Sequence, residues 1–354
     1  MDSVSSFDDP RSGGATVAPP TLRLACAVSA DERRLFLSHA TAALEALPVE
    51  LIWICTDEAG AAVARLQAVN PHIVISGWST PPLAEDWLRS PGCALRYVCH
   101  LAGSVRHLVP RAFLERGGMV TNWGDIPSGA VAEQALLLAL AALRNQRGWQ
   151  EIVRRTEEGG SHVERLRTRT LFGRRVGIHG FGRVARALVP LLRPFGVVMR
   201  AYSSGVPREL IVAQGVAPSL SLKALAAEAD VFFECEALTV TSAGSVSPEV
   251  LATLPDGAVL VNVGRGGLVD EVALLRETES GRIRVALDVV IAEPLVPASA
   301  FCRVRDAILS PHIAGPTFDQ YAQCASLAAR NVACFLRQEP LTARVSLEEL
   351  DRST

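Results

Sequence analysis

The chain alternates short apolar, β-rich runs with stretches of helical periodicity from about residue 21 onward. In its first part the strand-like runs are Leu22–Val28, Leu51–Cys55, His72–Ser76, Leu95–Leu101 and Met119–Asn122. Helical stretches such as Glu32–Leu47 and Ala61–Val69 lie between them. Strands that alternate with helices in this way are typical of a parallel sheet covered on both faces. The first part of the chain therefore predicts one α/β unit.

A long helical stretch from Ser128 to about Thr156 leads into a second alternating series, and Gly159–Gly160 end that helix. The predicted strands of this series are Arg175–His179, Val197–Tyr202, Val231–Glu234, Ala258–Val263, Val285–Val289 and Ala307–Leu309. A last helix is predicted at about Phe318–Arg337, and its pattern does not decide which unit it covers. A chain of 354 residues is long enough for two domains, so we expect two parallel-sheet α/β units.

The composition excludes several classes of partner. Hydrophobic residues make up 49% and charged residues 20% of the chain, as in a well-buried globular protein. A net charge of −2 provides no electrostatic basis for binding nucleic acid or an anionic membrane. Residues 1–20 lack the apolar core of a signal peptide, and no apolar run is long enough to span a bilayer. We expect a cytoplasmic protein with a flexible tail at 1–20 and neither nucleic-acid nor membrane partners.

Cysteine and lysine limit the chemistry further. The eight cysteines form no CxxC pair and no His–Cys cluster, so we expect mostly buried free thiols and no metal site. Lys223 is the only lysine, and it lies in a helical stretch that is not a P-loop. Schiff-base chemistry also needs a lysine in a particular setting that this stretch lacks. Both reaction classes are therefore disfavoured.

A glycine turn opens the second α/β unit. Gly180-Phe-Gly182-Arg-Val-Ala185 follows the apolar strand and begins a helical pattern. Gly180 permits a tight turn, Gly182 lets the backbone approach a pyrophosphate, and Ala185 allows close packing of helix on strand. The helix N-terminus adds free N–H groups and the positive end of the helix dipole. This context predicts a dinucleotide site, the alternative being a turn that only connects strand to helix.

The end of the next strand leaves the kind of dinucleotide open. An acidic residue is expected there to hold the adenosine ribose hydroxyls. The strand instead ends in Ala201-Tyr202-Ser203-Ser204, with Arg200 and Arg208 nearby. Serines with an arginine are compatible with the 2′-phosphate of NADP, whereas a site without a ribose clamp would take NAD. Both cofactors remain possible at this stage.

Polar residues follow three later strands of this unit. Arg265 lies in LVNVGRGG just beyond one strand, Asp288 ends the next, and His312 follows the last, in LSPHIAG. Glu293 lies in the loop after Asp288. Ligands bind at the carboxyl ends of the strands in open α/β sheets. Each residue alone has a structural explanation, but together behind a glycine turn they predict an active site.

These motifs, in their order and spacing, resemble the D-isomer-specific 2-hydroxyacid dehydrogenase family. The most specific are GFGRVA at Gly180, NVGRGGLVDEVALL from Asn262, ALDVVIAEP at Ala286 and SPHIAG at Ser310, and the resemblance extends from Thr21 to about Leu336. It implies two Rossmann-like or flavodoxin-like domains with an active-site cleft between them that closes on the substrate. Residues 21–125 and 315–354 would form a discontinuous substrate domain, and 126–314 a Rossmann cofactor domain. It also implies a homodimer through the cofactor domains, with the helix from Ser128 taking part.

The same resemblance implies the reaction and the catalytic roles. A hydride would pass between NAD(P)(H) and C2 of a 2-oxo acid or D-2-hydroxy acid. His312 would be the general acid/base, a role suited to histidine near neutral pH. Glu293 would hydrogen-bond the other ring nitrogen, fixing the tautomer and favouring the imidazolium. Arg265 would bind the substrate carboxylate and polarise the keto oxygen.

Binding roles are implied as well. Asp288 would orient the nicotinamide carboxamide, and backbone N–H groups at Gly103 and Ser104 would hold the substrate carboxylate from the other domain. The residues implied to bind the cofactor are Gly180, Gly182, Arg183, Val184, Ser203, Val263, Gly264, Arg265, Asp288, His312 and Gly315.

The sequence departs from the family in several places. Cys235 and Ala237 stand where a histidine and a proline are usual, in a segment that borders the cofactor. The loop at Gly103 continues as Val105, Arg106 and His107 in place of acidic and amide residues. Surface drift explains that change, or else Arg106 or His107 meets a second anionic group on the substrate, such as a phosphate.

Other functions on the same scaffold remain as alternatives. The first is an NAD(H)-sensing corepressor that binds the dinucleotide without turnover, since a fold does not fix function. The second is a phosphite- or phosphonate-type dehydrogenase, which uses similar residues. The formate-oxidising branch is disfavoured, because it carries glutamine where this chain has Glu293. The complete set of Arg265, Glu293 and His312 favours the 2-hydroxyacid enzyme.

Overall fold

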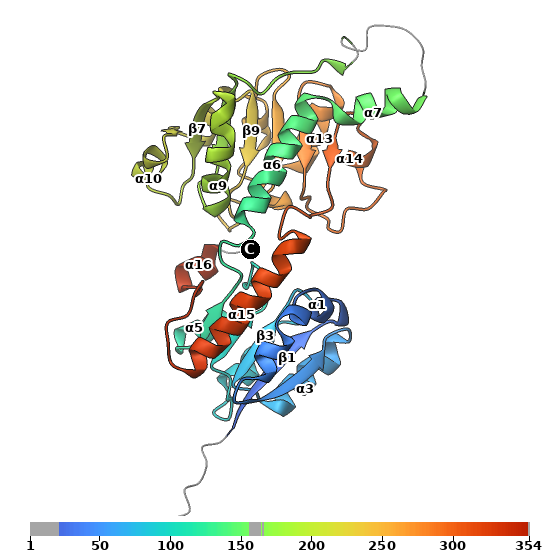
Figure 1. Cartoon of the computed structure of the whole chain (residues 1–354). Helices are drawn as coiled ribbons and strands as arrows, with labels where there is room; N and C mark the ends of the chain where they lie inside the picture. Colours follow the sequence, from blue (N-terminus) through green and yellow to red (C-terminus); the bar gives the residue numbers. More distant parts are fainter. Residues whose placement is uncertain (1–20, 156–163, 165, 353–354) are drawn as a thin grey trace, which may run out of the picture.

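The computed structural model describes residues 21–155, 164 and 166–352, so the predicted tail and Gly159–Gly160 lie outside the described residues. Within them the chain forms two lobes, each built on one parallel sheet (Figure 1). The first lobe contains a five-stranded sheet in the order β2-β1-β3-β4-β5. The second contains a seven-stranded sheet in the order β12-β11-β10-β9-β6-β7-β8. The prediction of two parallel-sheet α/β domains is confirmed.

The first lobe begins with alternating strands and short helices. Its elements are β1 (Leu22–Val28), α1 (Ala30–Leu35), η1 (Leu37–His39), α2 (Thr41–Glu45), β2 (Val49–Cys55), α3 (Ala59–Val69), β3 (Ile73–Ser76), α4 (Glu85–Arg89), β4 (Tyr97–His100), α5 (Arg111–Glu115) and β5 (Met119–Thr121). The single helix predicted at Glu32–Leu47 is wrong, since α1, η1 and α2 replace it. The backbone leaves the helical region at Ala40, with φ −122° and ψ −4°.

The second lobe follows a longer series of elements. They are α6 (Ser128–Leu143), α7 (Gln146–Arg155), β6 (Arg175–His179), α9 (Arg183–Leu192), η2 (Arg193–Phe195), β7 (Val198–Tyr202), α10 (Arg208–Ala213), β8 (Ala217–Pro218), α11 (Leu222–Ala227), β9 (Val231–Glu234), α12 (Pro248–Leu251), β10 (Val259–Asn262), η3 (Gly266–Leu268), α13 (Glu271–Glu279), β11 (Arg284–Leu287), α14 (Ala300–Arg303) and β12 (Ile308–Leu309). The helix predicted from Ser128 to Thr156 is two helices, because Asn145 adopts a left-handed φ of 49° and its side chain accepts a hydrogen bond from the Gly148 N–H.

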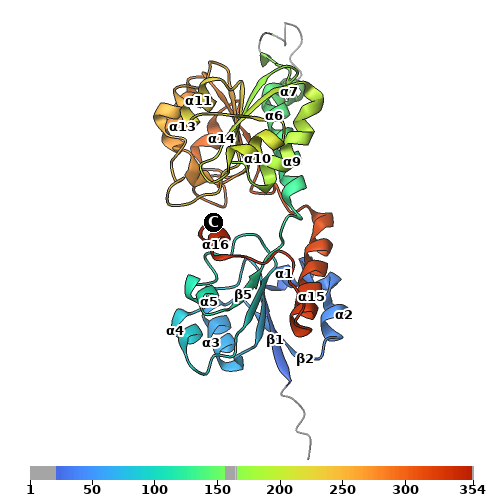
Figure 2. The same cartoon turned by 90° about the vertical axis from the view of Figure 1, so that its left-hand side faces the viewer.

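The C-terminal part returns to the first lobe (Figures 1 and 2). It comprises η4 (Phe318–Gln320), α15 (Tyr321–Leu336) and α16 (Leu347–Arg352). In α15, Ala325 and Val332 are buried in one cluster with Leu24 and Ile73 of the five-stranded sheet. This packing decides what the sequence pattern left open. On it we propose the domain limits 21–125 with 315–354, and 126–314.

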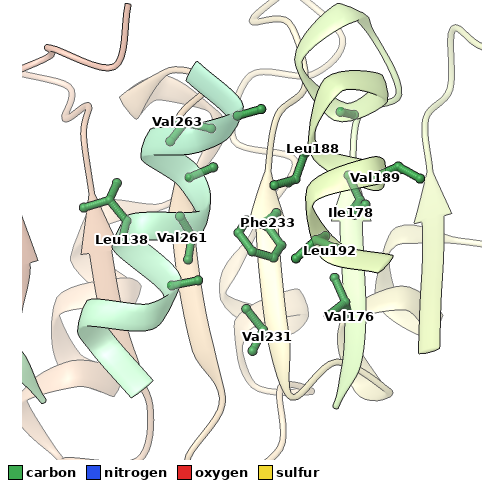
Figure 3. Close-up of a cluster of buried hydrophobic side chains, with 14 of the residues drawn as sticks. Leu138, Val176, Ile178, Leu188, Val189, Leu192, Val231, Phe233, Val261 and Val263 are labelled. Atoms are coloured by element: carbon green, nitrogen blue, oxygen red, sulfur yellow. The ribbon is translucent and has the colours of Figure 1, made fainter. Parts of the chain in front are cut away.

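Two helices side by side cover one face of the seven-stranded sheet (Figure 3). Leu138 of α6 and Leu188 and Leu192 of α9 lie on Phe233 and Val261 of the strands, and all five are at most 3% exposed. Burial of apolar side chains on both faces makes the central strands continuously hydrophobic. The resulting platform holds the loops at the strand ends, which carry the candidate site.

The cysteines differ in part from expectation. All eight are free thiols, but only Cys26, Cys99 and Cys324 are buried, so the expectation of mostly buried thiols is wrong. Cys55 is exposed because it ends β2, an edge strand. In the part of the chain that the structure describes, no group of three or more His, Cys, Asp or Glu side chains is arranged to hold a metal ion. No helix of the described segments is long and apolar enough to cross a bilayer.

Candidate active site

Strand register brings the predicted site residues to one edge of the second sheet. The last residues of adjacent parallel strands are paired across the sheet: His179 with Glu234, Glu234 with Asn262, and Asn262 with Leu287. Loops that leave these strands therefore meet at the same edge. The glycine turn, Arg265, Asp288 and His312 all lie in such loops, as the sequence predicted.

The glycine turn has the geometry of a nucleotide cradle. Gly180 adopts a φ of +83°, and a Cβ there would lie 2.5 Å from the backbone of Glu236. Gly182 is the N-cap of α9, receives no side-chain cap, and has open space where its Cβ would be. Ala185 is buried against the sheet. Free N–H groups at the start of a ten-residue helix, with no side chain over them, fit a pyrophosphate.

The two residues after the turn were also predicted to contact the cofactor. Val184 is half-buried, whereas Arg183 is exposed. The guanidinium of Arg183 pairs with Asp125 at 2.6 Å and with Glu349 of α16 at 3.0 Å. Both carboxylates belong to the segments that we assign to the first lobe. Arg183 therefore links the lobes across the mouth of the predicted cofactor site.

His312 and Glu293 form a hydrogen-bonded pair. The Nδ1 atom of His312 lies 2.6 Å from Oε2 of Glu293, and the two side chains are 45% and 33% exposed. The other carboxylate oxygen of Glu293 accepts from the Val290 N–H at 3.3 Å. Because the carboxylate engages Nδ1, the Nε2 atom is the one left for a substrate. Both side chains also line a pocket with Asp288 and Ser310.

Asp288 holds the loop that carries His312. Its carboxylate is buried and accepts hydrogen bonds from the Ser310 hydroxyl at 2.6 Å and from the N–H groups of Ile313 and Ala314, both at 3.1 Å. Its carbonyl accepts from the His312 N–H at 2.9 Å. His312 itself has a φ of 54°, a conformation that non-glycine residues rarely adopt. This positioning role of Asp288 was not predicted from the sequence.

Arg265 projects from a rigid turn. Asn262 is 1% exposed, and its side chain donates to the Arg265 carbonyl and accepts from the Gly264 N–H, both at 3.0 Å. Val263 is part of the hydrophobic core. Burial lowers the pKa of the Arg265 guanidinium below its ordinary value, and the attraction of the Glu293 carboxylate opposes this shift only in part. Arg265 is thus a half-buried, permanently charged cation near the His312–Glu293 pair.

The remaining predicted residues lie on other elements. Gly315 packs on α6, since a Cβ there would lie 2.9 Å from the Val131 side chain. Gly103 and Ser104 follow β4 in the first lobe, and the Ser104 hydroxyl is buried with no hydrogen-bond partner among the described residues. Arg106 and His107 on the same loop are exposed. The hypothesis of a second anionic group stays a prediction.

Three polar residues under the glycine turn were missed. His179 and Glu234 are 3% and 0% exposed, and Nδ1 of the histidine lies 2.6 Å from Oε2 of the glutamate. The other oxygen of Glu234 accepts from the Glu236 N–H at 2.9 Å. Burial opposes protonation of His179, but the Coulombic attraction and hydrogen bond of Glu234, with Glu236 nearby, outweigh it and raise its pKa. The signal in the sequence was two polar residues at the ends of strands that otherwise read as buried.

Comparisons with known proteins identify the family and the fold. Residues 136–314 match the model of the "D-isomer specific 2-hydroxyacid dehydrogenase, NAD binding domain" family. A glyoxylate/hydroxypyruvate reductase of Arabidopsis thaliana is 32% identical over 276 residues, 78% of this chain and 83% of the relative. A glyoxylate reductase/hydroxypyruvate reductase of Mus musculus is 29% identical over 264 residues, covering 73% and 80%. The crystal structure of a glyoxylate reductase from Paecilomyes thermophila has the same fold, with a TM-score of 0.79, 24% identity and coverage of 92% and 99%.

Proposed function

The chain belongs to the D-isomer specific 2-hydroxyacid dehydrogenase family, and from that premise we propose that it reduces a 2-oxo acid to the D-2-hydroxy acid, or catalyses the reverse. The observation that carries the proposal is the His312–Glu293 pair at the same sheet edge as Arg265 and the glycine turn. When bound, the nicotinamide supplies or accepts the hydride at C2. Either NAD or NADP as the cofactor is compatible with this proposal.

His312 supplies the proton that the carbonyl oxygen takes up when the hydride reaches C2. In the reductive direction its Nε2 donates a proton to the carbonyl oxygen as C2 is reduced, and in the oxidative direction it removes the hydroxyl proton. The Glu293 carboxylate, 2.6 Å from Nδ1, fixes the orientation and tautomer of the ring. Asp288 contributes by holding the loop from Ser310 to Ala314 in place.

Arg265 and the first lobe provide for the acid group of the substrate. The half-buried guanidinium of Arg265 suits a carboxylate and the polarised keto oxygen beside it. On the other lobe, the partnerless Ser104 hydroxyl and the adjacent Gly103 backbone are suited to donate to the same carboxylate. A buried polar group without a partner carries an energetic cost that a ligand relieves. This arrangement favours a small anionic substrate in a cleft between the domains.

The homodimer through the cofactor domains is also part of the proposal. Leu137 of α6 is 56% exposed, and Trp149 and Val153 of α7 are 40% and 72% exposed. Exposed apolar side chains on two consecutive helices support an association surface there. Light scattering on the purified protein would measure the mass, and a monomer would contradict this assignment.

The test of the proposed function is a panel of glyoxylate, hydroxypyruvate, pyruvate and larger 2-oxo acids, each assayed with NADH and with NADPH. We expect turnover with at least one acid, and the loss of reduced nicotinamide measures it. Dinucleotide binding without turnover on the whole panel would favour the sensing corepressor instead. Phosphite with oxidised cofactor completes the panel, since turnover with phosphite alone would favour the phosphite-type dehydrogenase.

Replacing Glu293 with glutamine is expected to lower kcat by about 10- to 100-fold. Changing a carboxylate that orients a functional histidine typically has an effect of this size. The amide keeps the size of the side chain but loses its charge, and its NH₂ group can present the wrong partner to Nδ1. Steady-state kinetics on the best acid would measure the effect. Glu279→Gln, an exposed position on α13, is the matched control. An unchanged kcat would remove Glu293 from the mechanism.

A further inference from the structure

A carboxylate lies beside the strand end where the sequence lacks one. In dinucleotide-binding domains, the acid that holds the adenosine ribose comes at the end of the second strand. Here β7 ends at Tyr202, and the next residue, Ser203, is 9% exposed. The loop after β9 approaches this point from the other side of the glycine turn. Its residue Glu236 has its backbone 2.5 Å from where a Gly180 Cβ would be.

The side chain of Glu236 reaches Ser203. The Ser203 hydroxyl donates a hydrogen bond to Oε2 of Glu236 at 2.7 Å, and the Ala237 N–H donates to Oε1 at 3.0 Å. Glu236 is half-buried, so its carboxylate is held in place yet open to a ligand. Each carboxylate oxygen has a second lone pair for a further donor. A ribose hydroxyl at this strand end is such a donor.

We propose that Glu236 is the ribose clamp of this protein and makes it selective for NADH over NADPH. The proposal rests on the proposed function, since it assumes a nicotinamide dinucleotide on the glycine turn. The carboxylate accepts a hydrogen bond from the 2′-hydroxyl of the adenosine ribose. A 2′-phosphate at the same position would instead face a like charge in a half-buried site, which costs affinity. The acid that β7 lacks is thus supplied by the loop after β9.

The network below Glu236 explains how the loop is fixed. The Glu236 N–H donates to Oε1 of Glu234, whose other oxygen is paired with His179. His179 and Glu234 are directly paired in register at the ends of β6 and β9. The backbone of the clamp residue is therefore tied to the strand that carries the glycine turn. Such tethering reduces the cost of ordering a side chain when a ligand binds.

The cations near this site do not favour the 2′-phosphate. Arg200 lies on β7, and its guanidinium pairs with Glu228 at 3.1 Å. Arg208 begins α10 and is exposed. The Glu236 carboxylate is the charged group that contacts Ser203 in the structure. A site that bound the 2′-phosphate through Ser203 would have to displace that carboxylate.

The test measures dinucleotide binding rather than turnover. Equilibrium fluorescence titration of the substrate-free protein with NADH and with NADPH gives two dissociation constants for each variant. We expect the wild-type protein to bind NADH at least about tenfold more tightly than NADPH. This factor corresponds to a difference of about 1.4 kcal/mol in binding free energy. Glu236→Gln should reduce this preference about tenfold, and Glu236→Arg should reverse it. Glu228→Gln, which removes a carboxylate paired with Arg200, is the matched control and should keep the preference.

The outcomes separate this inference from the proposed function. If the wild-type protein binds both dinucleotides equally or prefers NADPH, the clamp is refuted while the dehydrogenase proposal stands. An unchanged preference in both Glu236 variants, with unfolding temperatures like that of the wild type, also overturns it. If neither dinucleotide binds, the proposed function fails and the clamp fails with it. NADH selectivity that depends on Glu236 supports the clamp even where no acid of the panel is turned over.

Discussion

Replacing His312 with alanine is expected to lower kcat by about 10²- to 10⁴-fold, the range that a positioned general acid or base contributes. A histidine side chain suits proton transfer in both directions near neutral pH. The Nδ1 atom of His312 is hydrogen-bonded to Glu293, so the alanine variant loses both the proton donor and the contact that orients it. Steady-state kinetics with the best 2-oxo acid of the panel would measure the loss.

Binding experiments distinguish lost chemistry from a damaged site. The His312→Ala protein should keep most of its dinucleotide affinity although His312 is among the implied cofactor contacts, because the expected pyrophosphate contacts come from the glycine turn and α9, which follow β6. His39→Ala removes an exposed histidine of the first lobe and should leave kcat unchanged. If His312→Ala kept more than about a tenth of the wild-type kcat, another group would have to transfer the proton.

Much of the fold and part of the candidate site could be predicted because the information was local. Apolar runs separated by helical stretches predict a parallel sheet, and parallel strands place their carboxyl ends at one edge. Arg265 and His312 lie in the loops that directly follow β10 and β12, so the pattern placed both at one edge of the sheet. Glu293 lies farther along the loop after Asp288, and its contact with His312 was implied by the family resemblance. The glycine turn was similarly readable, since Gly180 and Gly182 stand between a buried strand and a helix.

What could not be predicted depends on contacts between distant segments. Asp288 was expected to face the cofactor, yet its carboxylate also organises the loop to Ala314, a contact across 26 positions. The clamp residue Glu236 was overlooked because the acid was expected at Ser203, 33 positions earlier, and only the folded sheet brings the two together. The helix break at Asn145 depends on one left-handed residue, which hydrophobic periodicity does not reveal.

Replacing His179 with leucine is expected to cost about 3–5 kcal/mol of folding stability, because it leaves the fully buried Glu234 carboxylate without its partner. For a lobe of this size that corresponds to a fall of roughly 6–20 °C in the unfolding temperature. The double variant His179→Leu with Glu234→Leu should recover part of the loss, since no buried charge remains. It should stay about 1–3 kcal/mol below the wild type, because the Glu236 N–H loses its acceptor. Calorimetric melting of the three proteins would measure these differences.

The pH dependence of the same comparison tests the origin of the effect. The pKa of His179 in the folded protein is raised above its ordinary value of 6.5: burial lowers it, but the attraction and hydrogen bond of Glu234, with a contribution from Glu236, outweigh burial. A raised folded-state pKa contributes stability that is fully present below pH 6.5 and is lost as pH rises through the folded-state pKa. The wild type should therefore exceed the double variant in stability by less and less as the pH is raised from 6.5 through the folded-state pKa. A double variant no more stable than His179→Leu, or an advantage that grows with pH, would show that the buried ion pair is not what holds these two strand ends together.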